Sequence, residues 1–407
     1  MEEIIGTEIN PYKIKKADII ISIPSLNEAE TIAIPVKQAA EGLKQYFSSY
    51  SSVIINCDAN STDGTKEVFL NTPTGDIPKI YLSTPLNVTG KGNALRMLFY
   101  KACEMEAKAI VTLDANLTSI TPRWIRNLCQ PLFENFGFVS PLYVRHKYDN
   151  MIANIIAYPL SRALYGRRIR QPVGGDFGFS GRLAEVYAQT DYWNEMVGQF
   201  GIDIWMVTIA VNTGTTICQS FMGRPKIHHV QTPPRDPALI FPQIMITIFD
   251  LMEIFAENWK KVKWSKPTAI FGFGLGEIEL PPPVNVDQEI LYQRFLKGFE
   301  EYNKIWEKFL NQSHLNKLWE IKTLNFEFFD FPTELWAKIL YDFAVGYKKT
   351  RDRKILIESL IPLYFGKMLS YVKKTQHMSI QEAEEFTEYE CEIFEKTKQY
   401  LLEKWDT

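Results

Sequence analysis

The sequence predicts an α/β fold with a largely parallel, doubly wound sheet, followed by a mostly helical C-terminal domain. In the first two hundred residues, short β-branched runs alternate with amphipathic stretches of helical period. This alternation is typical of strand–helix units that build a parallel sheet. Farther along, the period is helical and aromatic residues are frequent. A chain of 407 residues is too long for one ordinary core, so we expect two domains.

Four segments of the first half have the pattern of strands. They are DIIISIPS (18–25), SVIINCDA (52–59), IPKIYLST (77–84) and AIVTLD (109–114). Residues 30–47 and 92–106 lie between them and have the pattern of amphipathic helices. In open parallel sheets, ligands bind beyond the carboxyl ends of the strands. The polar residues that follow these strands are therefore the first candidates for a site.

The second half begins where the composition changes, after residues 223–238. We place the boundary at residue 230, which gives domains 1–230 and 231–407. The apolar run 238–259 is interrupted by acidic residues and predicts a buried helix rather than a membrane span. Residues 279–289 break the helical pattern, and the segment from Ser379 onward predicts one long helix that opens with a capping box.

Composition narrows the function classes. Hydrophobic residues make up 46% and the formal net charge is −3, so the chain has the profile of a soluble globular protein with no general attraction to nucleic acid. The five cysteines (57, 103, 129, 218 and 391) are odd in number and lack C-x-x-C spacing. With an acidic N-terminal segment in place of a signal peptide, these features predict a reduced, cytoplasmic protein.

Two polar stretches follow the first two predicted strands, SIPSLNEAETI (22–32) and CDANSTDGT (57–65). Asp58, Asn60, Ser61 and Asp63 have the hydrogen-bonding groups to hold the sugar and base edges of a nucleotide. The alternative is that residues 60–64 form a turn and a helix N-cap. Both interpretations remain open from the residues alone.

A third stretch, TGKGNALRM (89–97), places Lys91 between two glycines at a predicted helix start. Helix N-termini attract phosphate, glycines allow close backbone approach, and a lysine adds a point charge. The spacing is not that of a Walker A motif, so a P-loop is excluded.

Asp114-Ala115-Asn116 follows the fourth predicted strand. A divalent cation that bridges a diphosphate needs hard oxygen ligands, and a carboxylate and an amide carbonyl both qualify. We therefore expect a metal and diphosphate site whose metal binding is weaker because one carboxylate is replaced by an amide. A simple strand-end turn is the alternative.

Three later stretches carry further candidates. QPVGGDFGFSGRL (171–183) pairs a Gly-Gly turn with Asp176, and FGIDIWMV (200–207) contains Asp203. KIHHV (226–230) offers His228 and His229, of which one is expected to be a ligand because neighbours in a strand point to opposite faces.

Taken in order, these motifs resemble the retaining GT-A family of nucleotide-sugar glycosyltransferases, in particular the mannosylglycerate synthase and glucosyl-3-phosphoglycerate synthase groups. The similar segments are SIPSLNEAETI, DANSTDGT, GKGNAL, LDANLTSITPRWI, YVRHKYDNMI, QPVGGDFGFSGR, GIDIWMV and KIHH. The resemblance covers most of the chain. It implies a GT-A (Rossmann-like) domain over 1–230, and a helical domain over 231–407 that completes the acceptor site or forms a dimer.

The resemblance also implies roles for individual residues. The nucleotide-sugar would contact Pro24, Leu26, Glu28, Asp58, Lys91, Asp114, Ala115, Gly174 and Gly175. Asp203, Asp176 and Lys91 would be the catalytic groups, and the acceptor would lie against Arg145 and Asp203. Asp114, Asn116 and His228 would be the metal ligands, for Mg²⁺, Mn²⁺ or Co²⁺.

Two departures from the family pattern bear on these roles. The metal motif commonly reads Asp-x-Asp, whereas Asn116 stands here in the last position. The loop after Arg145 is shorter than in the mannosylglycerate enzymes, and it lacks the Gly-rich acceptor segment of the phosphoglycerate enzymes. The resemblance therefore leaves the identity of the acceptor open.

The expected function is transfer of glucose or mannose from a GDP- or UDP-linked donor to D-glycerate or 3-phosphoglycerate, as in compatible-solute synthesis. A homodimer without nucleic acid or membrane-span partners is expected. The alternatives are a non-catalytic nucleotide-sugar binder, a transferase with another small or lipid-linked acceptor, and a nucleotidylyltransferase. The last is disfavoured because PSLNEAE follows the first long strand where a basic, Gly-rich loop would be required.

Overall fold

A computed structural model describes residues 4–229, 236–272 and 279–407. The chain divides into two compact units, each discontinuous in sequence. Unit 1 comprises Met1–Val144, Gln171–Arg235 and Thr268–Pro281, and unit 2 comprises Arg145–Arg170, Asp236–Pro267 and Pro282–Thr407. The predicted boundary at residue 230 falls outside the described residues. Residues 145–170 lie within the predicted N-terminal domain 1–230, but they belong to unit 2 because their helical segments pack on its C-terminal helices.

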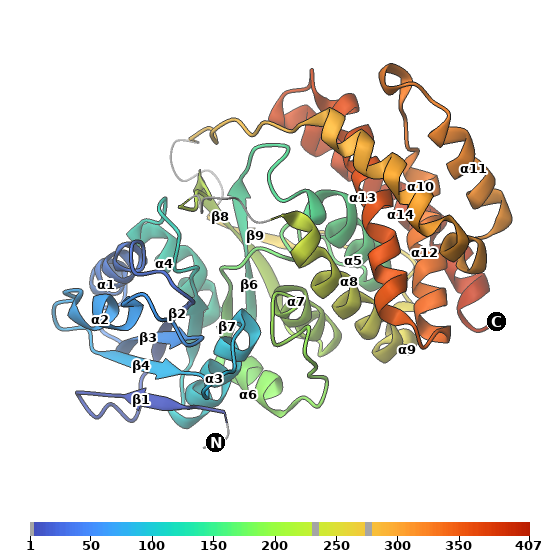
Figure 1. The fold of residues 1–407 in the computed structure, drawn as a ribbon. Helices are drawn as coiled ribbons and strands as arrows, with labels where there is room; N and C mark the ends of the chain where they lie inside the picture. The colour runs from blue at the N-terminus through green and yellow to red at the C-terminus, as the bar shows by residue number, and fades with distance from the viewer. Residues whose placement is uncertain (1–3, 230–235, 273–278) are drawn as a thin grey trace. The chain divides into compact units, whose positions relative to one another are not determined.

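Unit 1 is built on one nine-stranded sheet with the order β1-β4-β3-β2-β5-β7-β6-β8-β9 (Figure 1). The strands are β1 (Thr7–Ile9), β2 (Ile19–Ser25), β3 (Ser52–Asp58), β4 (Lys79–Ser83), β5 (Ala109–Thr112), β6 (Phe138–Val144), β7 (Gly178–Ser180), β8 (Ile217–Pro225) and β9 (Ala269–Phe271). β1 and β7 run antiparallel to their neighbours, and the other pairs are parallel. The predicted α/β class and all four predicted strands are confirmed.

Helices cover both faces of this sheet. The helices of unit 1 are α1 (Ala33–Tyr46), α2 (Thr65–Asn71), α3 (Lys91–Glu104), α4 (Pro122–Cys129), α6 (Gly181–Gln189) and α7 (Ile202–Asn212), with the 3-10 turn η1 (Gln130–Phe133). One face packs on α1 and α4, where alternate residues of β2 such as Ile19, Ile21 and Ile23 are fully buried. On the other face, Phe99 of α3 packs on the rings of Phe179 in β7 and Trp205 in α7. This double cover holds the strand ends in place.

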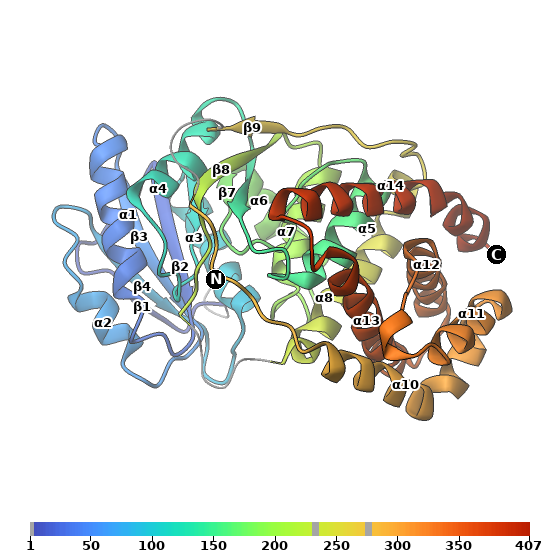
Figure 2. The same cartoon turned by 90° about the horizontal axis from the view of Figure 1, so that it is seen from above.

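Unit 2 is helical, as the composition of the C-terminal half predicts. Its elements are the π-helix η2 (Ala153–Ala157), α5 (Tyr158–Tyr165), α8 (Pro237–Ile254), α9 (Ala256–Trp259), α10 (Gln288–Phe309), α11 (Gln312–Lys322), the 3-10 turn η3 (Phe326–Phe328), α12 (Thr333–Lys349), α13 (Arg353–Thr375) and α14 (Ile380–Trp405). Figure 2 shows α14 and α5 side by side, and these helices pack on each other. The capping box at Ser379 and Glu382 is confirmed.

The apolar run 238–259 differs from its prediction as one helix. It forms α8 and α9, because Phe255 leaves helical geometry with φ −100° and ψ 25°. Within the described residues, α13 has the length and composition to cross a membrane, but 83% of its most apolar window is buried inside the protein. A core helix passes the same test, so this is weak evidence for a span. All five cysteines are free thiols.

Candidate functional site

The predicted site residues gather at the carboxyl ends of the central strands of unit 1. β2 pairs with β3 on one side and with β5 on the other, and the chain proceeds outward from β2 in both directions. This is a topological switch point, where open α/β sheets bind their ligands. Asp58 ends β3, and Asp114 follows β5 at this edge of the sheet. The sequence and the topology therefore indicate the same place.

Asp58 is the centre of a buried hydrogen-bond network at the end of β3. Its side chain is inaccessible to solvent. One carboxylate oxygen accepts from the hydroxyls of Ser25 and Ser61, and the other accepts from the Ser61 N–H (2.8 Å) and the Tyr81 hydroxyl (2.9 Å). The network joins the carboxyl ends of β2 and β3 to Tyr81 in β4. In this arrangement Asp58 organises the loops, and its predicted contact with a nucleotide stays a prediction.

The loops after β2 and β3 also bind each other directly. Asp63 accepts from the Ala29 N–H (3.0 Å), and Asn60 donates to the carbonyls of Pro85 and Val88. Gly64 begins α2 with a positive φ of 94°. The polar groups of residues 60–64 thus form the turn and helix start that the sequence offered as the alternative to nucleotide contacts.

Three further predicted nucleotide contacts lie beside this network. Pro24 is buried within β2 next to Cys57, and Leu26 is half-buried just beyond the strand. The Glu28 carboxylate is half-buried and accepts from the Thr31 hydroxyl at 2.9 Å. Leu26 and Glu28 therefore retain exposed atoms at the edge where a nucleoside is expected.

Lys91 is the first residue of α3. The backbone N–H groups that follow it have partners within the protein, so they do not form an open phosphate-binding loop. The N–H groups of Gly92 and Asn93 donate to the carbonyls of Gln199 and Gly198, at 3.1 and 2.9 Å. A Cβ at Gly92 would lie only 1.8 Å from the Val197 carbonyl oxygen. The glycine is therefore needed for close packing of this loop, and the two amides are engaged by it. The phosphate-binding capacity here lies in the Lys91 side chain.

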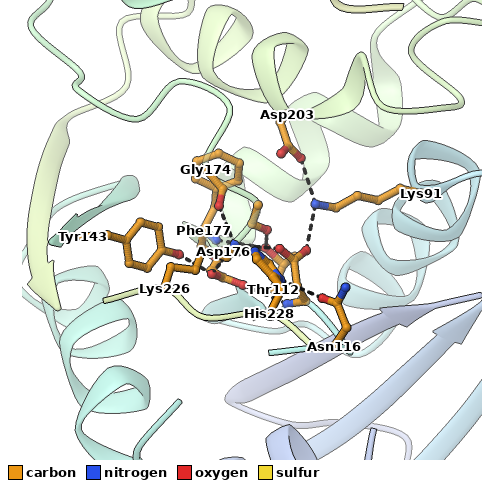
Figure 3. A network of polar contacts seen from close by, with 12 residues as sticks. Lys91, Thr112, Asn116, Tyr143, Gly174, Asp176, Phe177, Asp203, Lys226 and His228 are labelled. Atoms are coloured by element: carbon orange, nitrogen blue, oxygen red, sulfur yellow. Dashed lines mark hydrogen bonds and ion pairs between the residues drawn. The ribbon is translucent and has the colours of Figure 1, made fainter. Parts of the chain in front are cut away.

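The same packing brings α3 next to the start of α7, where Asp203 lies. Lys91 Nζ is 3.0 Å from Asp114 Oδ1 and 3.2 Å from Asp203 Oδ1, and Figure 3 shows the ammonium pointing toward Asp203. Burial opposes the charge on Lys91, but Asp114 and Asp203 outweigh it and hold the pKa of the ammonium above its usual value. Burial raises the pKa of Asp203, which Lys91 offsets only in part. Lys91, Asp114 and Asp203, which the sequence analysis took from three separate motifs, thus lie together.

Lys226 is a central member of the site that the sequence analysis did not identify. Its ammonium lies 2.6 Å from Asp114 Oδ2, 2.8 Å from Asp176 Oδ2 and 2.7 Å from the Gly174 carbonyl oxygen. The ring centroid of Tyr143 is 5.2 Å from the same nitrogen. With only 2% of its side chain exposed, Lys226 has three oxygen acceptors for its three N–H donors.

A short backbone ladder positions Lys226. The segment after β8 pairs with the residues that follow Asp114. Thr118 N–H donates to the Ile227 carbonyl (2.9 Å), and His229 N–H donates to the Asn116 carbonyl (2.8 Å). Leu117 and His228 form an antiparallel bridge. These bonds fix residues 226–229 against the Asp114 loop, although more than a hundred residues separate them in the chain.

Asp176, predicted as a catalytic group, is wholly buried beneath the site. One carboxylate oxygen accepts from the Asp114 backbone N–H at 2.8 Å, and the other accepts from the Tyr143 hydroxyl and from Lys226. It therefore fixes the backbone of Asp114 and the ammonium of Lys226. Its position favours a positioning role over contact with a reacting atom.

Gly174 and Gly175 form the turn that precedes Asp176. Gly175 has a φ of +86°, and a Cβ there would lie 2.5 Å from Asp114 Oδ2 and 2.9 Å from Lys226 Nζ. A side chain would thus be strained and would collide with the ion pair. The two glycines, predicted to shape the donor-sugar site, pack directly against the Asp114–Lys226 pair.

The three predicted metal ligands come together, and both Asp114 oxygens, Asn116 Oδ1 and His228 Nδ1 have partners within the protein. Both Asp114 oxygens contact lysine ammoniums, and the Asn116 Oδ1 accepts from His228 Nδ1 at 2.8 Å. Burial would raise the pKa of Asp114, but Lys226 and Lys91 outweigh it and hold that pKa well below the usual value. The described residues contain no group of three or more His, Cys, Asp or Glu suited to a metal ion. A divalent cation ligated by Asp114 and Asn116 would have to displace the partners that these oxygens already have.

Two predicted residues remain. Ala115, between Asp114 and Asn116, is buried. Arg145 belongs to unit 2, where its guanidinium lies 2.7 Å from Asp149 Oδ2. Its predicted contact with an acceptor stays a prediction.

Tyr143 had no usable sequence signal, and Lys226 had only a weak one. A single lysine before a His-His pair and a tyrosine in a strand are common in any protein. Their roles depend on which carboxylates the fold places beside them. A weak clue was the position of Lys226 next to the His228 motif.

No protein-family model matches the chain, and no curated protein matches it. Solved structures of glucosyl-3-phosphoglycerate synthase from Mycobacterium tuberculosis are similar to 58% of the chain. The complex with Mn²⁺, UDP and glucosyl-3-phosphoglycerate has a TM-score of 0.46 and 20% identity over 79% of that chain. The complex with Mg²⁺ and UDP has a TM-score of 0.45 and 19% identity, also over 79% of that chain. The likeness is distant.

Proposed function

We propose that this protein is a retaining glycosyltransferase that moves glucose or mannose from a nucleoside diphosphate sugar to D-glycerate or 3-phosphoglycerate. The observation that carries the proposal is the Lys91 ammonium, held between Asp114 and Asp203 at the switch point of the sheet. The order of the sequence motifs along the chain supports the choice of substrates. The free thiols fit a cytoplasmic location, which we propose with it.

The chemistry of such a transfer suits this arrangement. A nucleoside diphosphate gains negative charge as it leaves the anomeric carbon, and a preorganised cation stabilises that charge. Lys91 is 13% exposed and lies at the strand-end edge, so its ammonium is suited to contact a phosphate oxygen. Holding the acceptor hydroxyl beside the departing phosphate, on the same face of the donor sugar, supplies much of the remaining rate enhancement.

Asp203 is proposed to position hydroxyl groups of the donor and acceptor. In a retaining transfer of this kind, the acceptor attacks the anomeric carbon from the same face from which the leaving group departs. A carboxylate is therefore not required as the nucleophile. Asp203 is 14% exposed, and Lys91 lies 3.2 Å from one of its oxygens. It can therefore accept a hydrogen bond from a sugar or acceptor hydroxyl while it remains beside Lys91.

Release of nucleoside diphosphate tests the proposal. GDP- and UDP-linked glucose and mannose would each be incubated with D-glycerate or 3-phosphoglycerate, with Mg²⁺, with Mn²⁺ and with EDTA. We expect one donor–acceptor pair to release diphosphate well above the acceptor-free control. Binding of a donor without release under any condition would favour the non-catalytic binder. Release of pyrophosphate from a nucleoside triphosphate and a sugar phosphate would favour the nucleotidylyltransferase.

A further inference from the structure

We infer that Lys226 takes the position of a divalent cation at Asp114, so that this carboxylate is not a metal ligand in the native protein. The inference starts from the contacts of Asp114, whose second oxygen lies 2.6 Å from Lys226 Nζ. A cation ligated by that oxygen would have to displace the ammonium.

The Lys226 ammonium is surrounded by protein partners. It is bound by two carboxylates and one backbone carbonyl, and the Tyr143 ring lies against it. Figure 3 shows Tyr143, Gly174 and Asp176 arranged around Lys226. Displacement would leave a buried positive charge without its partners, which is strongly unfavourable. The backbone ladder at residues 227–229 limits how far Lys226 can withdraw.

Two ammonium groups offset most of the carboxylate charge at this site without a divalent ion. Two carboxylates and a divalent cation sum to zero charge, which is the balance of an Asp-x-Asp metal site. Here Asp114, Asp176 and Asp203 carry three negative charges and Lys91 and Lys226 carry two positive charges, so these five groups sum to −1, and Asn116 adds no charge. Lys226 therefore supplies positive charge directly at Asp114, and the amide at Asn116 avoids the further negative charge of a second carboxylate.

Gly175 is a third part of the same arrangement. Its missing side chain leaves room for the Asp114 oxygen and the Lys226 nitrogen at distances where a Cβ would collide with both. The turn is therefore shaped around the ion pair. A consequence, which rests on the proposed function, is that a nucleoside diphosphate binds without a divalent cation bridging it to Asp114.

Direct Mn²⁺ binding, measured by electron paramagnetic resonance on the full chain, tests the inference independently of sugar transfer. The variants are Lys226→Met, Lys226→Arg, Asp114→Asn and the double variant Lys226→Met/Asp114→Asn. We expect Lys226→Met to bind Mn²⁺ at least about tenfold more tightly than the native protein, and the double variant to lose this gain. Lys226→Arg keeps the charge and is expected to behave as the native protein does.

Lys79→Met is the matched control for loss of a buried lysine. Lys79 donates to the carbonyls of Phe69, Leu70 and Thr72, away from the site. Its removal is expected to leave Mn²⁺ binding unchanged. If Lys226→Met does not fold, the native protein and Asp114→Asn still decide the question. Equal Mn²⁺ binding by these two supports the inference, and weaker binding by Asp114→Asn overturns it.

Calorimetric titration with GDP and UDP adds a second readout. We expect the affinity of the native protein for its preferred nucleotide to be similar in the presence of EDTA and in the presence of Mn²⁺, with a difference of less than about threefold. A tenfold or larger gain with Mn²⁺, lost in Asp114→Asn, would overturn the inference. That result would not contradict the proposed sugar transfer. Conversely, nucleotide binding that does not depend on the cation, with no sugar transfer, would contradict the proposed function but not the inference about Lys226.

Discussion

Lys226 Nζ lies 2.6 Å from Asp114 Oδ2, although 112 residues separate the two in the chain. Asp176 and the Gly174 carbonyl complete the surroundings of the ammonium. The pair joins the loop after β5 to the segment after β8. It thereby holds Asp114 in the orientation in which its other oxygen meets Lys91.

Replacing Lys91 with methionine is expected to reduce sugar transfer by about 10²-fold or more, because a preorganised charge aimed at the leaving group is lost. Steady-state release of nucleoside diphosphate measures this effect. Lys66→Met, which removes an exposed ion pair with Glu67, serves as the control and should retain native turnover. Equal turnover by Lys91→Met and the control would remove Lys91 from the mechanism.

Replacing Asp176 with asparagine is expected to lower the free energy of unfolding by about 3 kcal/mol, because it leaves the buried Lys226 with one carboxylate fewer. Tyr143→Phe removes one hydrogen bond to the same carboxylate and should cost about 1 kcal/mol. Urea denaturation measures both. The exposed Asp76→Asn is the control. A loss for Asp176→Asn no larger than for Tyr143→Phe would show that the Asp176–Lys226 pair contributes little.

Replacing Asp58 with asparagine is expected to cost about 1–3 kcal/mol of stability, because an amide N–H₂ would face hydroxyl and N–H donors that now meet a carboxylate. Because the network orders the loops after β2 and β3, nucleotide affinity should fall with it. Thermal unfolding and calorimetric titration with GDP or UDP measure the two effects. Native stability with lost affinity would instead support direct contact between Asp58 and the nucleotide.

Lys398 in unit 2 predicts a pH dependence of stability. It donates to the carbonyls of Leu164, Trp259 and Val262, and burial lowers its pKa to about 8 from an ordinary value of 10.5. At a pH between these two pKa values, Lys398 is protonated in the unfolded chain and deprotonated in the folded chain. The contribution of Lys398 to the free energy of unfolding therefore rises as the pH increases above 8. Below pH 8 this contribution does not change with pH.

Comparison with Lys398→Met isolates this contribution. Between pH 7 and pH 9, the free energy of unfolding of the native protein should rise by about 1 kcal/mol relative to that of the variant. Urea denaturation at the two pH values measures the difference. A constant difference between the proteins would show that the three carbonyls keep the ammonium charged in the folded state.

The sequence was sufficient for the framework of the fold. The β-branched runs at 18–25, 52–59, 77–84 and 109–114 are buried strands, and their hydrophobic period alone indicates this. Lys91, Asp114 and Asp203 were found because each stands in a recognisable local pattern at an element boundary. Two other features depend on long-range packing, which local patterns do not encode. They are the short antiparallel β7 and the packing of residues 145–170 on the C-terminal helices.

The electrostatic state of the site could not be predicted in the same way. Asp114-Ala115-Asn116 has the pattern of a metal motif, and nothing near it in the chain indicates a lysine at its carboxylate. Asp58 follows a strand as a ligand-binding residue would, yet it is wholly buried. In both cases the decisive partner comes from a distant segment: Lys226 for Asp114, and Tyr81 for Asp58.

Analysis of the product by proton NMR tests the central claim most directly. The purified chain would be incubated with each GDP- or UDP-linked hexose and with D-glycerate or 3-phosphoglycerate. The account predicts that one pair gives a new glycoside signal with the anomeric configuration of the donor, in step with release of nucleoside diphosphate. Intact donor with every acceptor, or free hexose as the only product, would contradict it.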